Sequence, residues 1–356
     1  MATQNANEHP VVFVKGRGAG SNRPSRYLKE VEETDPDFNP ADVRTEVTER
    51  QAKSILNKNN SPDLSFDTTL NPYQGCEHGC VYCFARPTHS YLNLSPGLDF
   101  ETKLFAKVNA AEVLRAELSR KGFDPGIVAL GASTDAYQPI ERKLQITRRI
   151  VEVLAEFNVA VGITTKSALV TRDIDLLAPM AAKGLVRVHM SIPTLDHELS
   201  RRLDPRANSP TRRLEAIQEL TEAGIPVALY ASPIIPLVND QELESLLEAA
   251  AARGATSASH TLVRLPREVR DLFVEWLNKW YSDQAAEIMR TINAMHEGKD
   301  YDSRFGARLR GTGDLAQAMS DRFYAKRAEL GLGSPGKTLN TSLFNPAAAE
   351  PQGSLF

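Results

Sequence analysis

The chain has 356 residues, of which 42% are hydrophobic and 24% are charged, and its formal net charge is -3. This composition excludes a fibrous protein, a chain that is disordered throughout and a histone-like polycation, although a local cationic groove remains compatible with it. Prolines interrupt the longest apolar run, residues 225–238, so no segment approaches the roughly 20 apolar residues that cross a bilayer. We therefore expect no membrane partner. The N-terminal residues lack the pattern of a secretory signal, which places the chain in the cytoplasm.

Residues 1–62 are rich in Asn, Pro, Gly and charge, and they predict an N-terminal arm that lies on the domain surface or is partly disordered. The arm carries five cations with little acid between them: Lys15, Arg17, Arg23, Arg26 and Lys29. Clustered cations of this kind are typical of a phosphate contact, so the arm is a candidate contact for DNA.

From Phe66 onward, short apolar or β-branched runs alternate with longer segments of helical periodicity. The predicted strands are residues 66–71, 127–131, 159–165, 186–192, 226–232 and 258–263. The predicted helices are residues 109–121, 141–157, 171–183, 209–224 and 239–254, and four of them are followed by Gly122, Gly184, Gly224 and Gly254. Glycine at these positions suits a left-handed C-terminal cap. The alternation predicts parallel strands in a doubly wound sheet or in a full or partial (β/α) barrel, with functional residues at the carboxyl ends of the strands.

Residues 63–265 thus form the predicted core, and two further helical patterns within residues 266–332 predict a C-terminal helical extension. Residues 333–356 are rich in Pro, Ala and Ser and predict a flexible tail. The last five residues, Gln352–Phe356, resemble the motif with which bacterial replication and repair proteins bind the sliding clamp. The alternative is a terminal anchor that packs on its own domain.

All three cysteines, Cys76, Cys80 and Cys83, lie within eight residues of each other, which rules out a disulfide scaffold and indicates a shared ligand. Three thiolates on one loop can bind three irons of a [4Fe–4S] cluster and leave the fourth iron without a protein ligand. The alternative is a zinc site in which His78 or His89 supplies the fourth ligand.

The Cys-x3-Cys-x2-Cys spacing, with Tyr82 before the last cysteine, resembles the radical S-adenosylmethionine (radical SAM) superfamily. Residues 132–141, 163–177, 189–227 and 232–240 are similar to uncharacterised bacterial members that are related to spore photoproduct lyase. The resemblance implies an α/β fold, a partial (β/α)6 TIM-like barrel with an N-terminal arm and a C-terminal helical extension. It also implies a [4Fe–4S] cluster that cleaves S-adenosylmethionine to a 5′-deoxyadenosyl radical, and a reductant such as flavodoxin or ferredoxin.

The same resemblance implies a set of positions that bind S-adenosylmethionine: Tyr82, Ser133, Thr134, Asp135, Lys166, Ser191, Pro233 and Ile234. Asp135 and the two hydroxyl residues before it would receive the methionine amino group, and Lys166 would pair with the carboxylate. Ser191 would reach the ribose or the methionine, and Pro233 with Ile234 would flank the adenine. The alternatives are a helix N-cap for Asp135, a solvated loop cation for Lys166 and a simple strand-end hydroxyl for Ser191.

Spore photoproduct lyase is associated with a fourth cysteine that donates hydrogen, whereas this chain has no cysteine outside the triplet. Among the remaining side chains, Tyr137 is the candidate catalytic hydrogen donor, and the alternative is that Tyr137 only closes a loop.

Arginines recur after the fourth predicted strand and again near the C-terminus: 201, 202, 206, 212 and 213, then 304, 308 and 310. Glu198, Asp204 and Glu215 lie among the first group, which favours an ordinary solvated helix face over a phosphate-binding groove. Two functions remain open. One is a radical SAM enzyme that acts on damaged DNA as a lyase, or on another substrate. The other is a non-catalytic zinc or iron–sulfur protein that is recruited to DNA through its tail.

Overall fold

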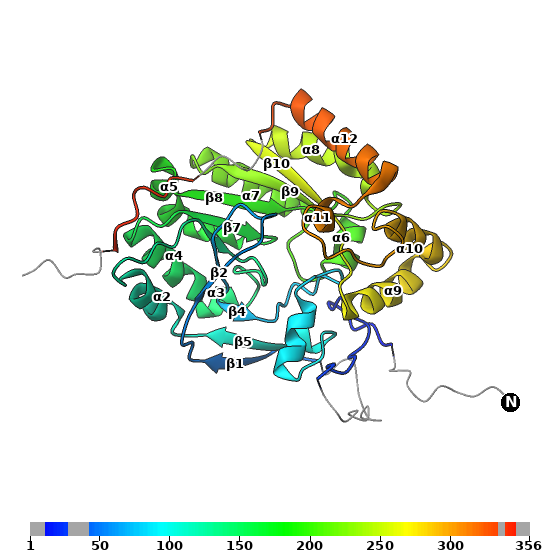
Figure 1. Cartoon of the computed structure of the whole chain (residues 1–356), viewed down its shortest axis with the longest axis horizontal. Coiled ribbons are helices and arrows are strands. Elements are labelled where there is room, and N and C mark those ends of the chain that lie inside the picture. Colours follow the sequence, from blue (N-terminus) through cyan, green and yellow to red (C-terminus); the bar gives the residue numbers. More distant parts are fainter. Residues whose placement is uncertain (1–10, 28–42, 334–338, 347–356) are drawn as a thin grey trace, which may run out of the picture.

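The computed structural model describes residues 11–27, 43–333 and 339–346, and a curved parallel sheet forms its centre (Figure 1). Within these ranges the main sheet has seven strands in the order β10-β9-β8-β7-β6-β3-β2. Their bounds are β2 Leu56–Lys58, β3 Thr68–Leu70, β6 Val128–Leu130, β7 Val161–Thr165, β8 Val186–Ser191, β9 Val227–Ile234 and β10 Ser257–Leu262. All neighbours from β3 to β10 pair in parallel, and β2 pairs with β3 antiparallel at one edge.

Each predicted strand is present, and the prediction of a partial (β/α)6 barrel is confirmed. The connecting helices are α2 Ala110–Leu118, α4 Ile146–Glu156, α5 Ile174–Ala182, α7 Pro210–Glu222 and α8 Leu243–Ala252. The four glycines expected as helix caps have left-handed backbones, with φ between 71° and 88°. The crossover helices place the loops that follow β6, β7, β8 and β9 at one common end of the sheet.

The helix predicted over residues 141–157 is interrupted. A short helix α3, Glu141–Leu144, ends at Gln145, whose φ is 51°, and α4 starts at the next residue. The buried carboxylate of Glu141 accepts hydrogen bonds from the backbone amides of Thr147 (3.0 Å) and Arg148 (3.3 Å) in the first turn of α4. The break therefore lets one carboxylate satisfy amides that a continuous helix would bond internally.

A second sheet, three-stranded within the described part of the chain, was not predicted. It has the order β1-β5-β4, with β1 at Glu46–Arg50, β5 at Lys103–Lys107 and β4 at Tyr73–Gln74. All five residues of β1 are exposed and β4 has two residues, so neither strand shows the alternation of apolar and polar residues that marks a half-buried strand.

The C-terminal extension packs on both the barrel and the cysteine loop. Its helices are α9 Glu268–Trp280, α10 Ala285–Ala294, α11 Ala307–Arg310 and α12 Gly313–Glu329. Helix α12 contacts α8, and α11 lies against β10 (Figure 1). Trp276 and Ile288 belong to an apolar cluster that also contains Cys80 and Val81. The extension is thus part of the wall around the cysteines. No helix in the described ranges has the length and apolar character to cross a membrane.

The two faces of the sheet differ in polarity. Val186, Val188 and Met190 of β8 are buried with the helices, whereas Arg187 and His189 between them are partly exposed. Thr164 is paired in register with His189, and Tyr230 is paired with Ser191, so the same polar face extends over β7 and β9. The inner face of the partial barrel is therefore a polar, accessible cup.

Part of the predicted arm is built into the fold through Glu117 of α2. This carboxylate is buried and accepts hydrogen bonds from the amides of Ile55 (3.2 Å) and Leu56 (3.0 Å) and from the hydroxyl of Ser54 (2.5 Å). Because these bonds join residues about 60 positions apart, they attach β2 to the barrel.

Replacing Glu117 with Ala should lower the free energy of unfolding by about 2 kcal/mol, because two buried amides would lose a charged acceptor. Urea unfolding measures this loss. Glu112→Ala provides the control, since Glu112 is exposed on the same helix and its loss should change stability by less than about 0.5 kcal/mol. Equal effects of the two substitutions would contradict the anchoring role of Glu117.

Candidate functional site

The cysteine loop follows β4 and is tightly folded. Cys76 and Cys80 are 6% and 7% exposed, and Cys83 is half-buried. Gly75 has a φ of 78°, and a Cβ there would lie 2.7 Å from a Leu104 methyl carbon and 2.9 Å from the Phe100 carbonyl oxygen. A side chain at Gly75 would force the loop open, so this glycine is needed for the close wrapping of the loop.

The three thiols lie close enough to influence one another. Burial raises the pKa of Cys80 well above its usual value, and the other two thiols and Asp204 act in the same direction. Burial also raises the pKa of Cys83. Three thiols on one loop are the donor set for three irons of a [4Fe–4S] cluster, so Cys76, Cys80 and Cys83 fit that group.

The two histidines considered as zinc ligands have other partners. His78 Nδ1 lies 3.2 Å from Asp135 Oδ2, and His89 Nε2 lies 3.0 Å from the carbonyl oxygen of Lys103. Burial alone would lower the pKa of His78, but the Asp135 carboxylate raises it to about 10. Because Asp135 already engages Nδ1 of His78, the zinc alternative gains no support from this histidine.

A buried ion pair braces the loop from behind. Arg86 and Glu101 are both 0% exposed, and Arg86 Nη2 lies 2.5 Å from Glu101 Oε1. The Arg86 guanidinium also donates to the carbonyl oxygens of Gly79 (3.1 Å) and Cys80 (2.9 Å). One arginine thereby fixes the backbone at the middle cysteine. The sequence analysis missed both residues, because a lone Arg and a distant Glu form no recognisable motif.

The N-terminal arm completes this brace. The amides of Gly18 and Ala19 donate to the two oxygens of Glu101, each at 2.9 Å, and Arg17 donates to the Glu101 carbonyl oxygen at 3.0 Å. A Cβ at Gly18 would lie 1.7 Å from the carbonyl oxygen of Gly79. Residues 17–21 are therefore buried beside the cysteine loop rather than lying on the surface as expected.

The arm's other arginines face the protein as well. Arg23 pairs with Glu275 at 2.8 Å and with Asp271 at 3.2 Å, and Arg26 pairs with Glu268 at 2.5 Å. These carboxylates all lie on α9 and neutralise the cations that were considered for DNA contact. Lys29 and the clamp-like residues Gln352–Phe356 lie outside the described residues.

A second buried network stands at the carboxyl ends of β7 and β8. The Tyr82 hydroxyl donates to Asp204, and Arg213 donates to Asp204 at 3.1 Å and to the Ser191 carbonyl oxygen at 2.9 Å. Lys166 Nζ lies 5.7 Å from the centre of the Tyr82 ring. Burial would lower the pKa of Lys166, but the neighbouring Cys80 and Asp204 raise it. Lys166 is thus a cation that faces the cysteine loop.

The prediction of a solvated arginine face is wrong for Asp204 and Arg213, which are 1% and 0% exposed. They lie near the turn between α6, His197–Leu203, and α7, where the chain runs back toward the strand ends. No pattern in the sequence distinguishes the buried Arg213 from the adjacent, more exposed Arg212. The other arginines of the group lie nearer the surface, and Arg202, Arg206 and Arg212 pair with Glu198, Glu77 and Glu215.

Asp135 connects three elements of the site. Its oxygens accept hydrogen bonds from the Thr165 hydroxyl (2.7 Å), the Lys166 amide (2.7 Å) and the Tyr137 amide (2.9 Å), in addition to the His78 contact. Burial would raise its pKa, but His78 and these donors lower it to about 2. The Asp135 carboxylate thus holds the loops after β6 and β7 together. Asp135 was expected to receive the methionine amino group, but its oxygens already accept hydrogen bonds from protein donors.

The remaining predicted ligands line the same end of the sheet. Ser133 is exposed, whereas the Thr134 hydroxyl donates to the Tyr73 carbonyl oxygen at 2.9 Å. The Ser191 hydroxyl donates to the Ser232 carbonyl oxygen at 3.2 Å, next to a cis peptide bond that leads into Pro233. Pro233 and Ile234 are buried at the end of β9. Their roles toward S-adenosylmethionine stay predictions.

Tyr137 faces a different set of groups. It is 0% exposed, and its hydroxyl donates to Asp173 at 3.0 Å. Burial and the nearby Asp173 raise the pKa of Tyr137 well above its usual value, and the other charged groups near it are Arg172 and Glu141. The phenol is therefore engaged with a carboxylate, and hydrogen donation by Tyr137 stays a prediction.

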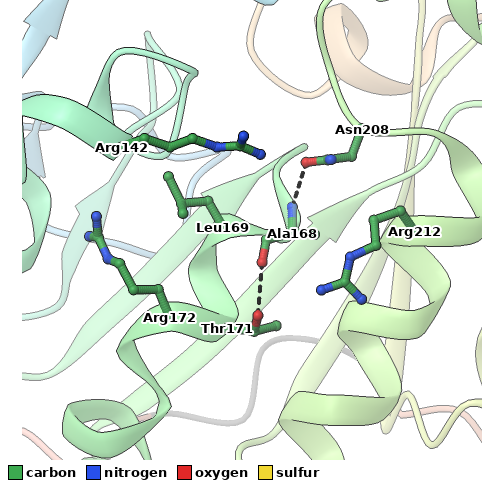
Figure 2. A pocket seen from close by; sticks show the side chains of 7 residues that line it. All are labelled: Arg142, Ala168, Leu169, Thr171, Arg172, Asn208 and Arg212. Carbon is green, nitrogen blue, oxygen red and sulfur yellow. Dashed lines mark hydrogen bonds between the residues drawn. The ribbon is translucent and has the colours of Figure 1, made fainter.

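A pocket of about 290 Å³ lies beside the loop that contains Ala168 and Leu169, and Figure 2 shows the residues around it. Asn208 accepts a hydrogen bond from the Ala168 amide at 2.8 Å and so fixes this loop. Three arginines line the pocket: Arg142, Arg172 and Arg212. Arg172 is paired with Glu141 and Asp173, and Arg212 is paired with Glu215 and Glu219. Carboxylates therefore neutralise two of the three arginines.

Comparison with known proteins places these features in a family. The model of the radical SAM superfamily matches residues 70–250, just over half of the chain. An uncharacterised protein of Mycobacterium tuberculosis is 39% identical over 228 residues, which cover 63% of this chain and 67% of that protein. An uncharacterised protein of Methanocaldococcus jannaschii is 28% identical over 199 residues, which cover 56% of this chain and 71% of that protein.

Among solved structures, spore photoproduct lyase complexed with dinucleoside spore photoproduct superposes with a TM-score of 0.57 at 14% identity. The match covers 82% of this chain and 80% of that one, and it establishes a shared fold. The parallel partial barrel with a three-cysteine loop at its strand ends defines a protein of the α/β class that carries the donor set for an iron–sulfur cluster. The chain belongs to the radical SAM superfamily. Membership implies a [4Fe–4S] cluster and S-adenosylmethionine as cofactors.

Replacing Arg86 with Met should lower the free energy of unfolding by about 3–5 kcal/mol, because Glu101 would keep a buried charge without its main partner. Denaturant unfolding measures the loss, and iron content should fall with it. Arg322→Met provides the control, since the pair of Arg322 and Glu244 is 41% and 36% exposed and should contribute less than about 1 kcal/mol.

In a double-mutant cycle, Arg86→Met combined with Glu101→Leu should cost less than the sum of the single substitutions. Additive losses would show that the two residues act independently of each other.

Proposed function

We propose that this radical SAM protein abstracts hydrogen from a lesion in DNA and opens the lesion as a lyase. The observation that carries this proposal is the likeness to spore photoproduct lyase, which extends over 82% of the chain and is therefore longer than the barrel alone. That protein has been solved with dinucleoside spore photoproduct, and a variant of it with both AdoMet and the dinucleoside.

The chain's own residues would divide the task. Cys76, Cys80 and Cys83 would hold the cluster, which when bound supplies the electron for cleavage of S-adenosylmethionine. Lys166 offers a cation to the methionine carboxylate, and Ser133 and Ser191 offer hydroxyls beyond β6 and at the end of β8, on either side of β7. The buried network of Tyr82, Asp204 and Arg213 would keep Lys166 and the loop in position without water. A flavodoxin or ferredoxin would serve as reductant.

Two assignments need adjustment on this proposal. Asp135 is surrounded by protein donors, so its proposed part is to orient the loops that meet the methionine rather than to bind it alone. For hydrogen return, Tyr137 remains the proposed donor, and its bond to Asp173 would have to break first. Clamp binding by Gln352–Phe356 stays a prediction that deletion of these five residues tests.

Anaerobically reconstituted protein should release 5′-deoxyadenosine from S-adenosylmethionine in the presence of dithionite, and liquid chromatography measures the product. Cys80→Ala should abolish the product, because one iron would lose its ligand. Arg322→Met lies on the surface of α12 and should retain cleavage. If the wild type releases no more product than Cys80→Ala, the catalytic proposal fails, and a non-catalytic metalloprotein becomes the better explanation.

The DNA substrate is tested with DNA whose thymidine carries deuterium. Hydrogen abstraction would transfer this deuterium to the 5′-deoxyadenosyl radical, so we expect mass spectrometry to find deuterium in 5′-deoxyadenosine with ultraviolet-irradiated DNA and none with undamaged DNA. Irradiated RNA and a total protein extract, labelled in the same way, serve as parallel substrates. Transfer of label from either of these, or S-adenosylmethionine cleavage without transfer of label from DNA, would leave the radical chemistry intact and reject DNA as substrate.

A further inference from the structure

Two aromatic side chains stand exposed beside the site without a part in the networks described above. Phe84 directly follows Cys83 and is 44% exposed, and Phe305 precedes α11 and is 59% exposed. Helix α11 contacts β10 and lies next to its carboxyl end (Figure 1). Large rings that remain in water at the opening of a functional site are typical of a binding surface.

Each ring is covered by a guanidinium group. The Cζ atom of Arg264 lies 4.4 Å from the centre of the Phe84 ring, and that of Arg308 lies 4.8 Å from the centre of the Phe305 ring. Arg308 and Cys83 are both electrostatic neighbours of Arg264, and Phe84 directly follows Cys83, so the two pairs lie in the same region as the third cysteine. We call Phe84, Arg264, Phe305 and Arg308 the mouth platform.

The platform has a positive charge that the protein does not fully balance. Arg308 is paired with Asp63 at 2.6 Å. Among the described residues no carboxylate forms an ion pair with Arg264, whose side chain is hydrogen-bonded to Tyr301 and has Arg308 and Cys83 as further electrostatic neighbours. Burial lowers the pKa of Arg264, yet an arginine keeps its charge. Arg264 is therefore a half-buried cation beside an exposed ring, and it is available to form an ion pair with an anionic ligand.

The combination of exposed rings and cations restricts the kind of ligand that the platform can bind. A free phosphate would need the cations but not the rings, and an apolar peptide would need the rings but not the cations. A nucleobase stacks on phenylalanine and on guanidinium planes, and the phosphate attached to the same nucleotide pairs with arginine. Because the platform adjoins Cys83, a polynucleotide bound there would pass directly across the opening of the site.

We propose that the mouth platform stacks one unpaired nucleobase of a polynucleotide while Arg264 pairs with the adjoining phosphate. This inference rests on the proposed function, because it gives the DNA substrate its place on the protein. The stacked base would lie beside the target nucleotide and hold it out of the duplex stack, as enzymes that modify bases require.

The test measures fluorescence anisotropy of a labelled single-stranded DNA of about 10 nucleotides, a length in the site range of single-strand binders, with the reconstituted full chain. Phe84→Ala should weaken binding about tenfold, whereas Phe84→Trp should restore it to within about twofold. Arg264→Gln should weaken binding and lower the slope of log affinity against log salt by about one.

Trp280→Ala is the matched control. Trp280 is 39% exposed and is covered by Arg202, whose Cζ atom lies 4.5 Å from the ring, but this pair sits on α9 and α6. It has the same chemistry as the platform, and its loss should leave DNA binding unchanged. RNA of the same sequence shows whether the platform distinguishes the sugar, and the affinity for S-adenosylmethionine is measured for every variant.

The outcomes separate this inference from the proposed function. Equal DNA binding by the wild type and Phe84→Ala would overturn the platform and leave the DNA substrate in place. Loss of S-adenosylmethionine binding without loss of DNA binding would assign Phe84 to the cofactor and also overturn it. If the wild type binds neither DNA nor RNA yet cleaves S-adenosylmethionine, the DNA substrate fails and the platform fails with it.

Discussion

The geometry of the site depends on one buried ion pair, between Arg86 and Glu101. Two opposite charges that are fully removed from water are stable only when further hydrogen bonds complete their shells. Here those bonds come from the cysteine loop on one side and from residues 17–19 on the other. A single electrostatic unit thus fixes the loop that holds the cluster ligands and attaches the N-terminal segment behind it.

Around this unit, the partial barrel supplies two different surfaces. Its outer face is packed with helices, and its inner face carries polar residues such as Thr164, His189 and Tyr230. The cysteine loop, Lys166 and the Tyr82–Asp204 contact stand at the rim of this inner face. A polar cup with a charged rim suits a substrate that carries several hydrogen-bonding groups, as a nucleotide does.

Periodicity predicted the parallel strands and their connecting helices because the strands are buried and the helices amphipathic, and thiol spacing indicated Cys76, Cys80 and Cys83 as candidate cluster ligands. Exposed strands such as Glu46–Arg50 escaped notice, since no buried face imposes a pattern on them. Long-range polar pairs escaped for another reason. The burial of Arg213 depends on how helix α7 packs on the sheet. The residues that flank Arg213 in the sequence are as rich in charge as an exposed helix face. Local composition does not encode such placement.

The attachment of the N-terminal segment sets an order of events in the cell. Ser21 and Arg23 bond to Glu275, which lies more than 250 residues later in the chain. During synthesis, Ser21 and Arg23 therefore lack these contacts until the ribosome has made helix α9. The cysteine loop acquires its complete backing only after that moment.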